Sequence, residues 1–183
     1  RYITCPNQTV SDSKNHHPGI DNRGPFLAMN PFSSRCCQHN HAQGWPYYAE
    51  HLILATPDNG VAAAMYAACK ATVKVGDGNE ITLHEQTNYP FEETIRFTVN
   101  TPKAVSFPFY LRIPSWTEGA TIFVNGKKVA ANPEAGQYAC INREWKDNDQ
   151  VEIQLPMQLS MRTWQVNKNS VSCLLYTSDA ADE

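Results

Sequence analysis

The sequence predicts a mainly β protein: an antiparallel β-sandwich preceded by a loop and one helix. From residue 61 onward, short runs of alternating apolar and polar residues recur about ten residues apart, with turn residues between them. Before residue 56 the chain has a long segment rich in Asn, Pro, Gly, Ser and Asp, followed by one stretch of helical spacing.

The N-terminal third is expected to be a loop followed by a single helix. Residues 1–32 have no sustained period of 3.6 or 2, which is typical of an irregular segment. Aromatic and leucine residues from Trp45 to Ala55 fall near helical spacing, and Pro46 suits a first helical position. The turn-forming run at 56–60 ends this helix. One helix between a loop and strands suggests the last helix of a larger helical domain.

The rest of the chain is expected to form strands. The predicted runs are 61–67, 70–75, 80–87, 93–100 and 105–113, then 120–124, 127–130, 138–143, 149–155 and 159–164. Residues 76–79 and the pair Asn125-Gly126 are typical of hairpin turns. Pro108 indicates an edge strand or a bulge. The second set of strands either completes the first pair of sheets or forms a smaller unit of its own.

We therefore divide the chain at residues 57, 114 and 172. The four parts are 1–57 with the loop and helix, 58–114 with the first strands, 115–172 with the second strands, and 173–183. The last part resembles a translated sequencing adapter joined to a truncated gene, and the start at Arg1 suggests an absent upstream part. Without residues 173–183 the formal charge changes from −3 to 0, because three acids leave with them. The acidic balance thus indicates no partner.

Charge and hydropathy exclude two classes of partner. The 15 Lys and Arg residues are scattered, so no nucleic-acid partner is expected. No apolar run approaches the ~18 residues of a membrane span. No signal peptide is visible, and the sequence does not distinguish a cytoplasmic from a periplasmic or secreted location.

The run Arg35-Cys36-Cys37-Gln38-His39-Asn40-His41 is the candidate functional centre. Two cysteines and two histidines within six positions offer the sulfur and nitrogen ligands that zinc prefers. Adjacent cysteines do not share one face of a helix, so two sulfurs on one metal predict a bent backbone, as in a loop ahead of a helix. Further ligands would come from Cys5, His39, His41 or an upstream segment.

The residues alone leave several roles open for this pair. Cys36 and Cys37 could form a strained vicinal disulfide or be reduced and without a role. Cys36, beside Arg35, could be an activated thiolate nucleophile. His39, His41 and Trp45 could line a substrate site, although an aromatic on a helix also suits core packing. Cys69 and Cys140 lie in apolar strand-like runs and are expected to be small core residues.

The same run, followed by Gly44-Trp45-Pro46-Tyr47, resembles the end of the catalytic domain of glycoside hydrolase family 127, the β-L-arabinofuranosidases. The similarity covers about residues 31–161, in the family's order and spacing. The other matching stretches are Asp58-Asn59-Gly60-Val61-Ala62, Lys74-Val75-Gly76-Asp77-Gly78, Glu85-Gln86-Thr87-Asn88-Tyr89-Pro90, Leu111-Arg112-Ile113-Pro114-Ser115-Trp116 and Val124-Asn125-Gly126. Well-known members carry Cys-Cys-Pro-Pro-Asn where this chain has Gln38-His39-Asn40 after the pair, so it resembles a divergent branch.

The resemblance implies a fold and a reaction. Residues 1–57 would be the end of a six-hairpin α/α barrel, and β-sandwich domains would follow. The implied activity is that of a retaining exo-glycosidase on β-L-arabinofuranosides or related plant or bacterial glycans. Cys36 matches the nucleophile and a zinc ligand, and Cys37 matches a second zinc ligand. The other ligands and the acid/base glutamate lie upstream in the family, so we expect the 183-residue chain alone to be inactive.

A hypothesis from another class is kept beside this one. The β region could be a non-catalytic structural or carbohydrate-binding module, with Cys36 and Cys37 a structural or vestigial metal site. The two hypotheses differ in whether Cys36 is required for turnover of a glycoside.

Overall fold

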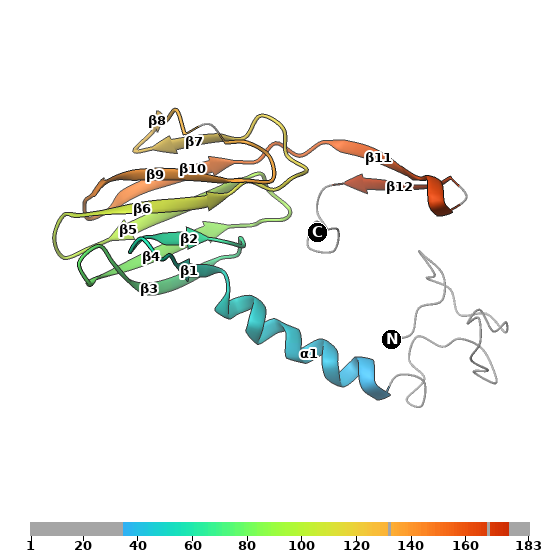
Figure 1. The fold of residues 1–183 in the computed structure, drawn as a ribbon, viewed down its shortest axis with the longest axis horizontal. Helices are drawn as coiled ribbons and strands as arrows, with labels where there is room; N and C mark the ends of the chain where they lie inside the picture. Colours follow the sequence, from blue (N-terminus) through green and yellow to red (C-terminus); the bar gives the residue numbers. More distant parts are fainter. Residues whose placement is uncertain (1–34, 132, 168, 176–183) are drawn as a thin grey trace. The chain divides into compact units, whose positions relative to one another are not determined.

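The computed structural model describes residues 35–131, 133–167 and 169–175; the side chains of 35–42, 167, 170 and 172–175 lie outside that description. The chain divides into two units, Arg1–Glu50 and His51–Glu183. Figure 1 shows a helix in the first unit and a layered β structure in the second.

The described part of the first unit is the helix α1, Arg35–Glu50. The predicted helix is confirmed from Trp45 to Glu50, but both predicted ends are wrong. The polar run after Arg35 has no apolar stripe, so periodicity did not reveal it, and Pro46 lies inside the helix. At the other end, Ile53–Ala55 forms the first strand, and the turn at residues 56–60 ends that strand.

Twelve strands follow within the described residues, and most agree with the predicted runs. They are β1 (Ile53–Ala55), β2 (Val61–Ala63), β3 (Cys69–Val75), β4 (Asn79–Thr87), β5 (Thr94–Asn100), β6 (Val105–Arg112), β7 (Thr121–Val124), β8 (Lys127–Lys128), β9 (Tyr138–Trp145), β10 (Asp149–Gln154), β11 (Leu159–Trp164) and β12 (Ser170–Leu175). A short 3₁₀ turn, Gln165–Asn167, precedes β12.

Two sheets make up the sandwich. The larger has the order β3-β4-β5-β10-β7-β8 and the smaller the order β1-β2-β6-β9, while β11 and β12 pair with each other. The hairpin at Asn125-Gly126 is confirmed: both residues have positive φ, 50° and 74°, as a tight two-residue turn requires. Most pairs are antiparallel, as predicted, but β2 and β6 are parallel.

The position of Pro108 differs from the prediction. Its strand β6 is central, between β2 and β9, rather than at an edge. The ladder with β2 begins only at Phe109, so Pro108 lies just beyond the end of that ladder. A proline without an N–H is therefore accepted in a central strand.

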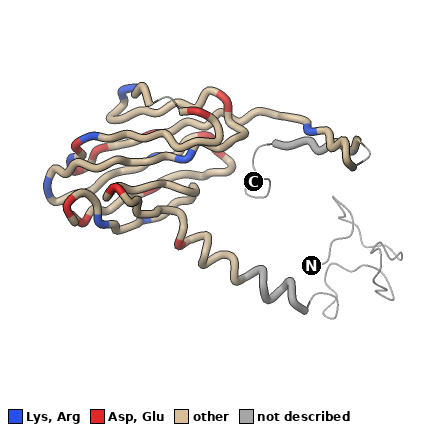
Figure 2. Tube along the Cα trace, in the orientation of Figure 1, with Lys and Arg blue, Asp and Glu red and all other residues tan. Residues whose placement is uncertain are grey.

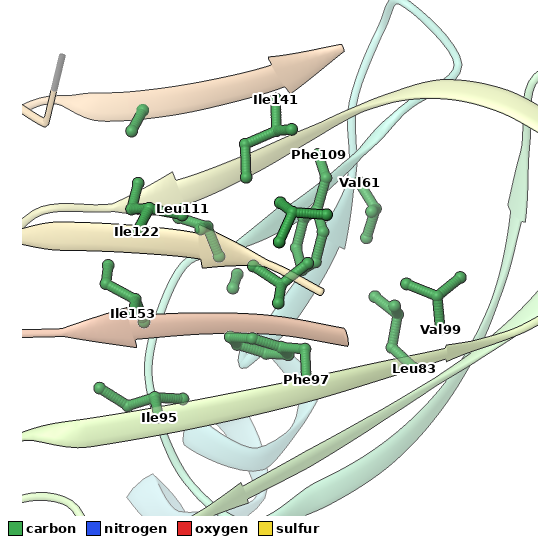
Figure 3. Packing of buried hydrophobic residues seen from close by; sticks show 14 of the residues in the cluster. Val61, Leu83, Ile95, Phe97, Val99, Phe109, Leu111, Ile122, Ile141 and Ile153 are labelled. Carbon is green, nitrogen blue, oxygen red and sulfur yellow. The ribbon is translucent and has the colours of Figure 1, made fainter. Parts of the chain in front are cut away.

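One apolar core lies between the two sheets (Figure 3). Strand alternation turns Ile95, Phe97 and Val99 of β5 inward, and all three are fully buried. Phe97 meets Phe109 of β6 edge to face, with ring centroids 5.3 Å apart. Two residues earlier in β6, the carbonyl of Phe107 accepts the indole N–H of Trp145 at 3.0 Å, which satisfies a buried donor.

The strands on either side of residue 114 share this core. β10 lies between β5 and β7 in the larger sheet, so the second set of strands completes the first pair of sheets. This pairing corresponds to the first of the two arrangements that the sequence left open. In the segment 173–183, residues 173–175 belong to β12 and pair with β11; residues 176–183 lie outside the described residues.

Basic and acidic residues are both scattered over the sandwich, among many uncharged ones (Figure 2). In the part of the chain that the structure describes, no helix is long and apolar enough to cross a membrane.

Candidate functional site

The two cysteines of the candidate centre lie in the first turn of α1. The helix begins at Arg35, so Cys36 and Cys37 have helical backbone, and the predicted bent loop at this position is wrong. The first turn contains no acidic residue. The first N–H groups of a helix have no intrahelical partner and give this end a partial positive charge, which favours a thiolate.

The remaining predicted site residues lie further along the same helix. Cys37 and His41 are four residues apart, a spacing that places two backbone positions on one side of a helix. Trp45 is 61% exposed and meets Tyr48 edge to face, with ring centroids 6.3 Å apart. A role for Trp45 in lining a substrate site therefore stays a prediction beside core packing.

The side chains that the structure describes contain no cluster of three or more His, Cys, Asp or Glu residues suited to a metal ion. The side chains of Cys36, Cys37, His39 and His41 lie outside that description. A zinc site at this run therefore stays a prediction, which the chemistry of its sulfur and nitrogen donors supports.

The two cysteines of the sandwich differ from their prediction and from the candidate pair. Cys140 is exposed, because alternation along β9 turns Ala139 and Ile141 inward instead. Cys69 is half-buried, and burial beside the Glu85 carboxyl raises the pKa of its thiol to about 11. A thiol with this pKa is protonated at neutral pH and is a poor nucleophile.

The structure also reveals a buried acid that we did not predict as a functional residue. Glu85 of β4 is only 1% exposed. Its Oε1 accepts the Ala67 N–H at 3.0 Å, and its Oε2 lies 3.7 Å from the Cys69 Sγ, which donates to it. Burial raises the pKa of Glu85 to about 8, so this carboxyl is mostly protonated at neutral pH. The sequence contained the signal, since Glu85 alternates in phase with Ile81 and Leu83.

The chain matches a family model across most of the sandwich. Residues 60–157 match the model described as β-L-arabinofuranosidase, GH127 middle domain. These limits run from the end of the turn after β1 to just beyond β10, and they include strands from both sides of residue 114. A comparison with curated proteins finds no match.

Solved structures agree with the family model. A GH127 β-L-arabinofuranosidase from Geobacillus stearothermophilus T6 is 30% identical over 78% of this chain, with a TM-score of 0.70. A structure described as a glycoside hydrolase is 31% identical over 79%, with a TM-score of 0.69. The GH127 β-arabinofuranosidase BT3674 is 26% identical over 71%, with a TM-score of 0.62.

The chain corresponds to only part of these relatives. It spans 23%, 24% and 23% of their respective lengths. The matched part contains the middle-domain sandwich, whose strands and core are described above. The sequence match over residues 60–157 and the shared fold together show that this chain belongs to glycoside hydrolase family 127, the β-L-arabinofuranosidase family.

Proposed function

We propose that this chain is part of a retaining exo-glycosidase that acts on β-L-arabinofuranosides or related plant or bacterial glycans, with Cys36 as its nucleophile. The observation that carries the proposal is the order of two features. The cysteine run stands at the start of α1, and the GH127 middle domain begins at residue 60, shortly after that helix ends. Residues 1–57 would then belong to the end of an α/α barrel.

The proposed reaction is a double displacement. The Cys36 thiolate attacks the anomeric carbon, so a sulfur–carbon bond forms while the bond to the leaving oxygen breaks. A carboxylic acid elsewhere in the whole protein gives its proton to that oxygen. Water then replaces the sulfur, and the second inversion restores the original configuration. Cys36 thus takes the place of the usual carboxylate nucleophile.

Cys36 and Cys37 would hold a zinc ion together with ligands elsewhere in the protein. On the helical backbone of α1 the two positions are about 100° apart around the axis, so an ion placed between these two directions could still take both sulfurs. When bound, zinc would lower the thiol pKa and so keep Cys36 in its thiolate form at neutral pH. The first turn of α1 acts in the same direction, because its unpaired N–H groups favour a negative charge. His39, His41 and Trp45 would line the substrate site on the following turns of the helix.

The nucleophile assignment is tested with the whole protein that contains this chain. Cys36→Ala should lower turnover of an aryl β-L-arabinofuranoside about a thousandfold or more, because the covalent step loses its nucleophile. Cys140→Ala is the matched control: Cys140 is an exposed cysteine of the sandwich, and its removal should leave the rate unchanged. The thermal midpoint of Cys140→Ala should equal that of the parent protein, and Cys36→Ala should keep a cooperative unfolding transition, at a lower midpoint if zinc is lost with the thiol.

Metal analysis separates the two roles of the cysteine pair. Cys37→Ser should lower the zinc content of the purified protein, whereas Cys140→Ser should not. Full activity of Cys36→Ala would end the nucleophile assignment and favour the non-catalytic module. Zinc retained in full by both Cys36→Ala and Cys37→Ser would end the metal assignment.

A further inference from the structure

A surface pocket of about 510 Å³ lies on the outer face of the smaller sheet, away from the core. Its lining is mainly apolar and includes two tyrosines and one carboxylate. The pocket is lined by Thr56, Pro57, Asp58, Ala62, Tyr110 and Tyr138.

The two tyrosines come from neighbouring strands and face the same side. In the β6–β9 ladder, Tyr110 pairs with Cys140 and Arg112 pairs with Tyr138, so the tyrosines are diagonal neighbours. Phe109 and Leu111 point into the core, which turns Tyr110 outward by strand alternation. Tyr138 is 48% exposed. The pair therefore offers aromatic surface to a ligand at the face of the sheet.

Asp58 is fixed at the edge of this surface. The Tyr110 hydroxyl donates to its Oδ2 at 2.6 Å, and the Thr56 hydroxyl donates to its Oδ1. These two hydrogen bonds, that of Thr56 first, hold the pKa of the Asp58 carboxyl below its usual value. Backbone N–H groups of Asp58 and Gly60 lower this pKa further, so much of the acceptor capacity of the carboxylate is already used, and a ligand hydroxyl would reach it from its exposed side.

The turn that carries Asp58 is itself tightly held. The Thr56 N–H donates to the Gly60 carbonyl at 3.1 Å, and the Gly60 N–H donates to the Thr56 Oγ1 at 3.1 Å. The carboxylate is therefore placed before any ligand arrives, which lowers the ordering cost of binding.

The chemistry of the pocket favours a neutral polyol over a protein segment. The residues that line it include no Lys or Arg. A protein segment without Lys or Arg, packed over the ionised Asp58, would desolvate it without a cationic partner, which is costly. A sugar instead donates hydroxyl groups to the carboxylate and places an apolar ring face on the tyrosines. Membership of a glycoside hydrolase family makes a sugar the expected occupant.

We propose that the pocket of Tyr110, Tyr138 and Asp58 is an accessory saccharide-binding site, in which a glycan chain stacks on the tyrosines and donates hydroxyl hydrogen bonds to the Asp58 carboxylate. The site takes up a sugar of the class proposed as substrate, but Cys36 has no part in it. It would hold the glycan without cleaving it.

Binding to the 183-residue chain tests this site. The probe is a β-L-arabinofuranosyl disaccharide, followed by saturation-transfer NMR and calorimetry. Tyr138→Ala and Asp58→Asn should each weaken binding about tenfold, through loss of stacking and of a charged acceptor. Tyr138→Phe keeps the ring and should bind like the parent. The control Phe91→Ala removes an aromatic that is 84% exposed outside the pocket and should change nothing.

Cys36→Ala distinguishes this site from the proposed catalytic centre. Disaccharide binding that survives Cys36→Ala but is lost in Tyr138→Ala supports the accessory site, whatever the role of Cys36. Binding lost in Cys36→Ala but kept in Tyr138→Ala overturns the accessory site and leaves the proposed catalytic function standing. An absence of binding by the parent chain also overturns it, as does displacement of the disaccharide by tetramethylammonium, which would indicate a cation site. If Tyr138→Ala fails to fold, Asp58→Asn takes its place in this comparison: weaker disaccharide binding supports the accessory site, and unchanged binding overturns it.

Discussion

Glu85 shows how the surroundings of one residue set its charge. The side chain shares the inward face of β4 with Ile81 and Leu83, and its contacts with Ala67 and Cys69 do not offset the loss of water. Burial is the largest cause of the shift that raises its pKa from 4.5 to about 8. The folded state therefore binds the Glu85 proton more tightly than the unfolded state does.

This shift predicts a stability that falls as the pH rises. Below pH 4.5 Glu85 is protonated in both states and the folded state bears no penalty. Between pH 4.5 and about 8 only the unfolded state ionises, so the free energy of unfolding decreases, by a few kcal/mol in total. Denaturant titrations of the chain between pH 5 and pH 9 measure this slope.

The variant Glu85→Gln should remove most of the slope. Its amide keeps an acceptor for the Ala67 N–H but carries no titratable proton, so the variant should be more stable than the parent at pH 9. Glu80→Gln, at an exposed position of the same strand, is the control and should keep the parental slope. A slope of parental size in Glu85→Gln would show that another group dominates.

The turn between β1 and β2, which the sequence predicted, packs closely against β6 and also lines the pocket of Tyr110, Tyr138 and Asp58. Gly60 stands where the chain passes closest to β6: a Cβ at this position would lie 2.3 Å from the Pro108 carbonyl oxygen. The same turn holds Thr56 and Asp58, and Asn59 adopts a φ of 59° within it. The turn-forming run at residues 56–60 is thus a tightly packed turn, and its residues Thr56, Pro57 and Asp58 line the pocket of Tyr110 and Tyr138.

Gly60→Ala should therefore destabilise the sandwich by about 2 kcal/mol or more, because a backbone atom of β6 must move to accommodate the added methyl group. Thermal unfolding followed by circular dichroism measures the effect. Gly44→Ala is the matched control: nothing lies within 4 Å of the corresponding Cβ in α1, so the unfolding midpoint of the sandwich should not change. Equal midpoints for the two variants would contradict the close approach of Gly60 to Pro108.

At the scale of the whole molecule, the two halves of the β region depend on each other. Six register pairs join β10 to β5, and eight pairs join β9 to β6. Residues as distant as Val61 and Leu155 belong to the same core. The strands before residue 114 therefore bury their inner faces only when the later strands are present.

A chain that ends at residue 114 should not fold. It would lose β9 and β10, and so expose Ile95, Phe97 and Phe109 to water. A chain that ends at residue 157 is the control, because it keeps every strand of both sandwich sheets. Circular dichroism should show a cooperative thermal transition for the control and none for the shorter chain. If the chain that ends at residue 114 showed a cooperative transition, residues 58–114 would be a domain of their own.

The sequence by itself determined the strand runs, the hairpin turns and the inward or outward direction of most strand residues, because these depend on local alternation and turn chemistry. Its motifs also indicated Cys36 and Cys37 as a candidate centre and resembled those of the family to which the chain belongs. It missed the start of α1, where a polar run gives no periodic signal. Only the tertiary structure decided that β10 lies between β5 and β7, and that Asp58 meets Tyr110 from 52 residues away. Such neighbours depend on which distant strands pair within a sheet, and no local pattern contains that information.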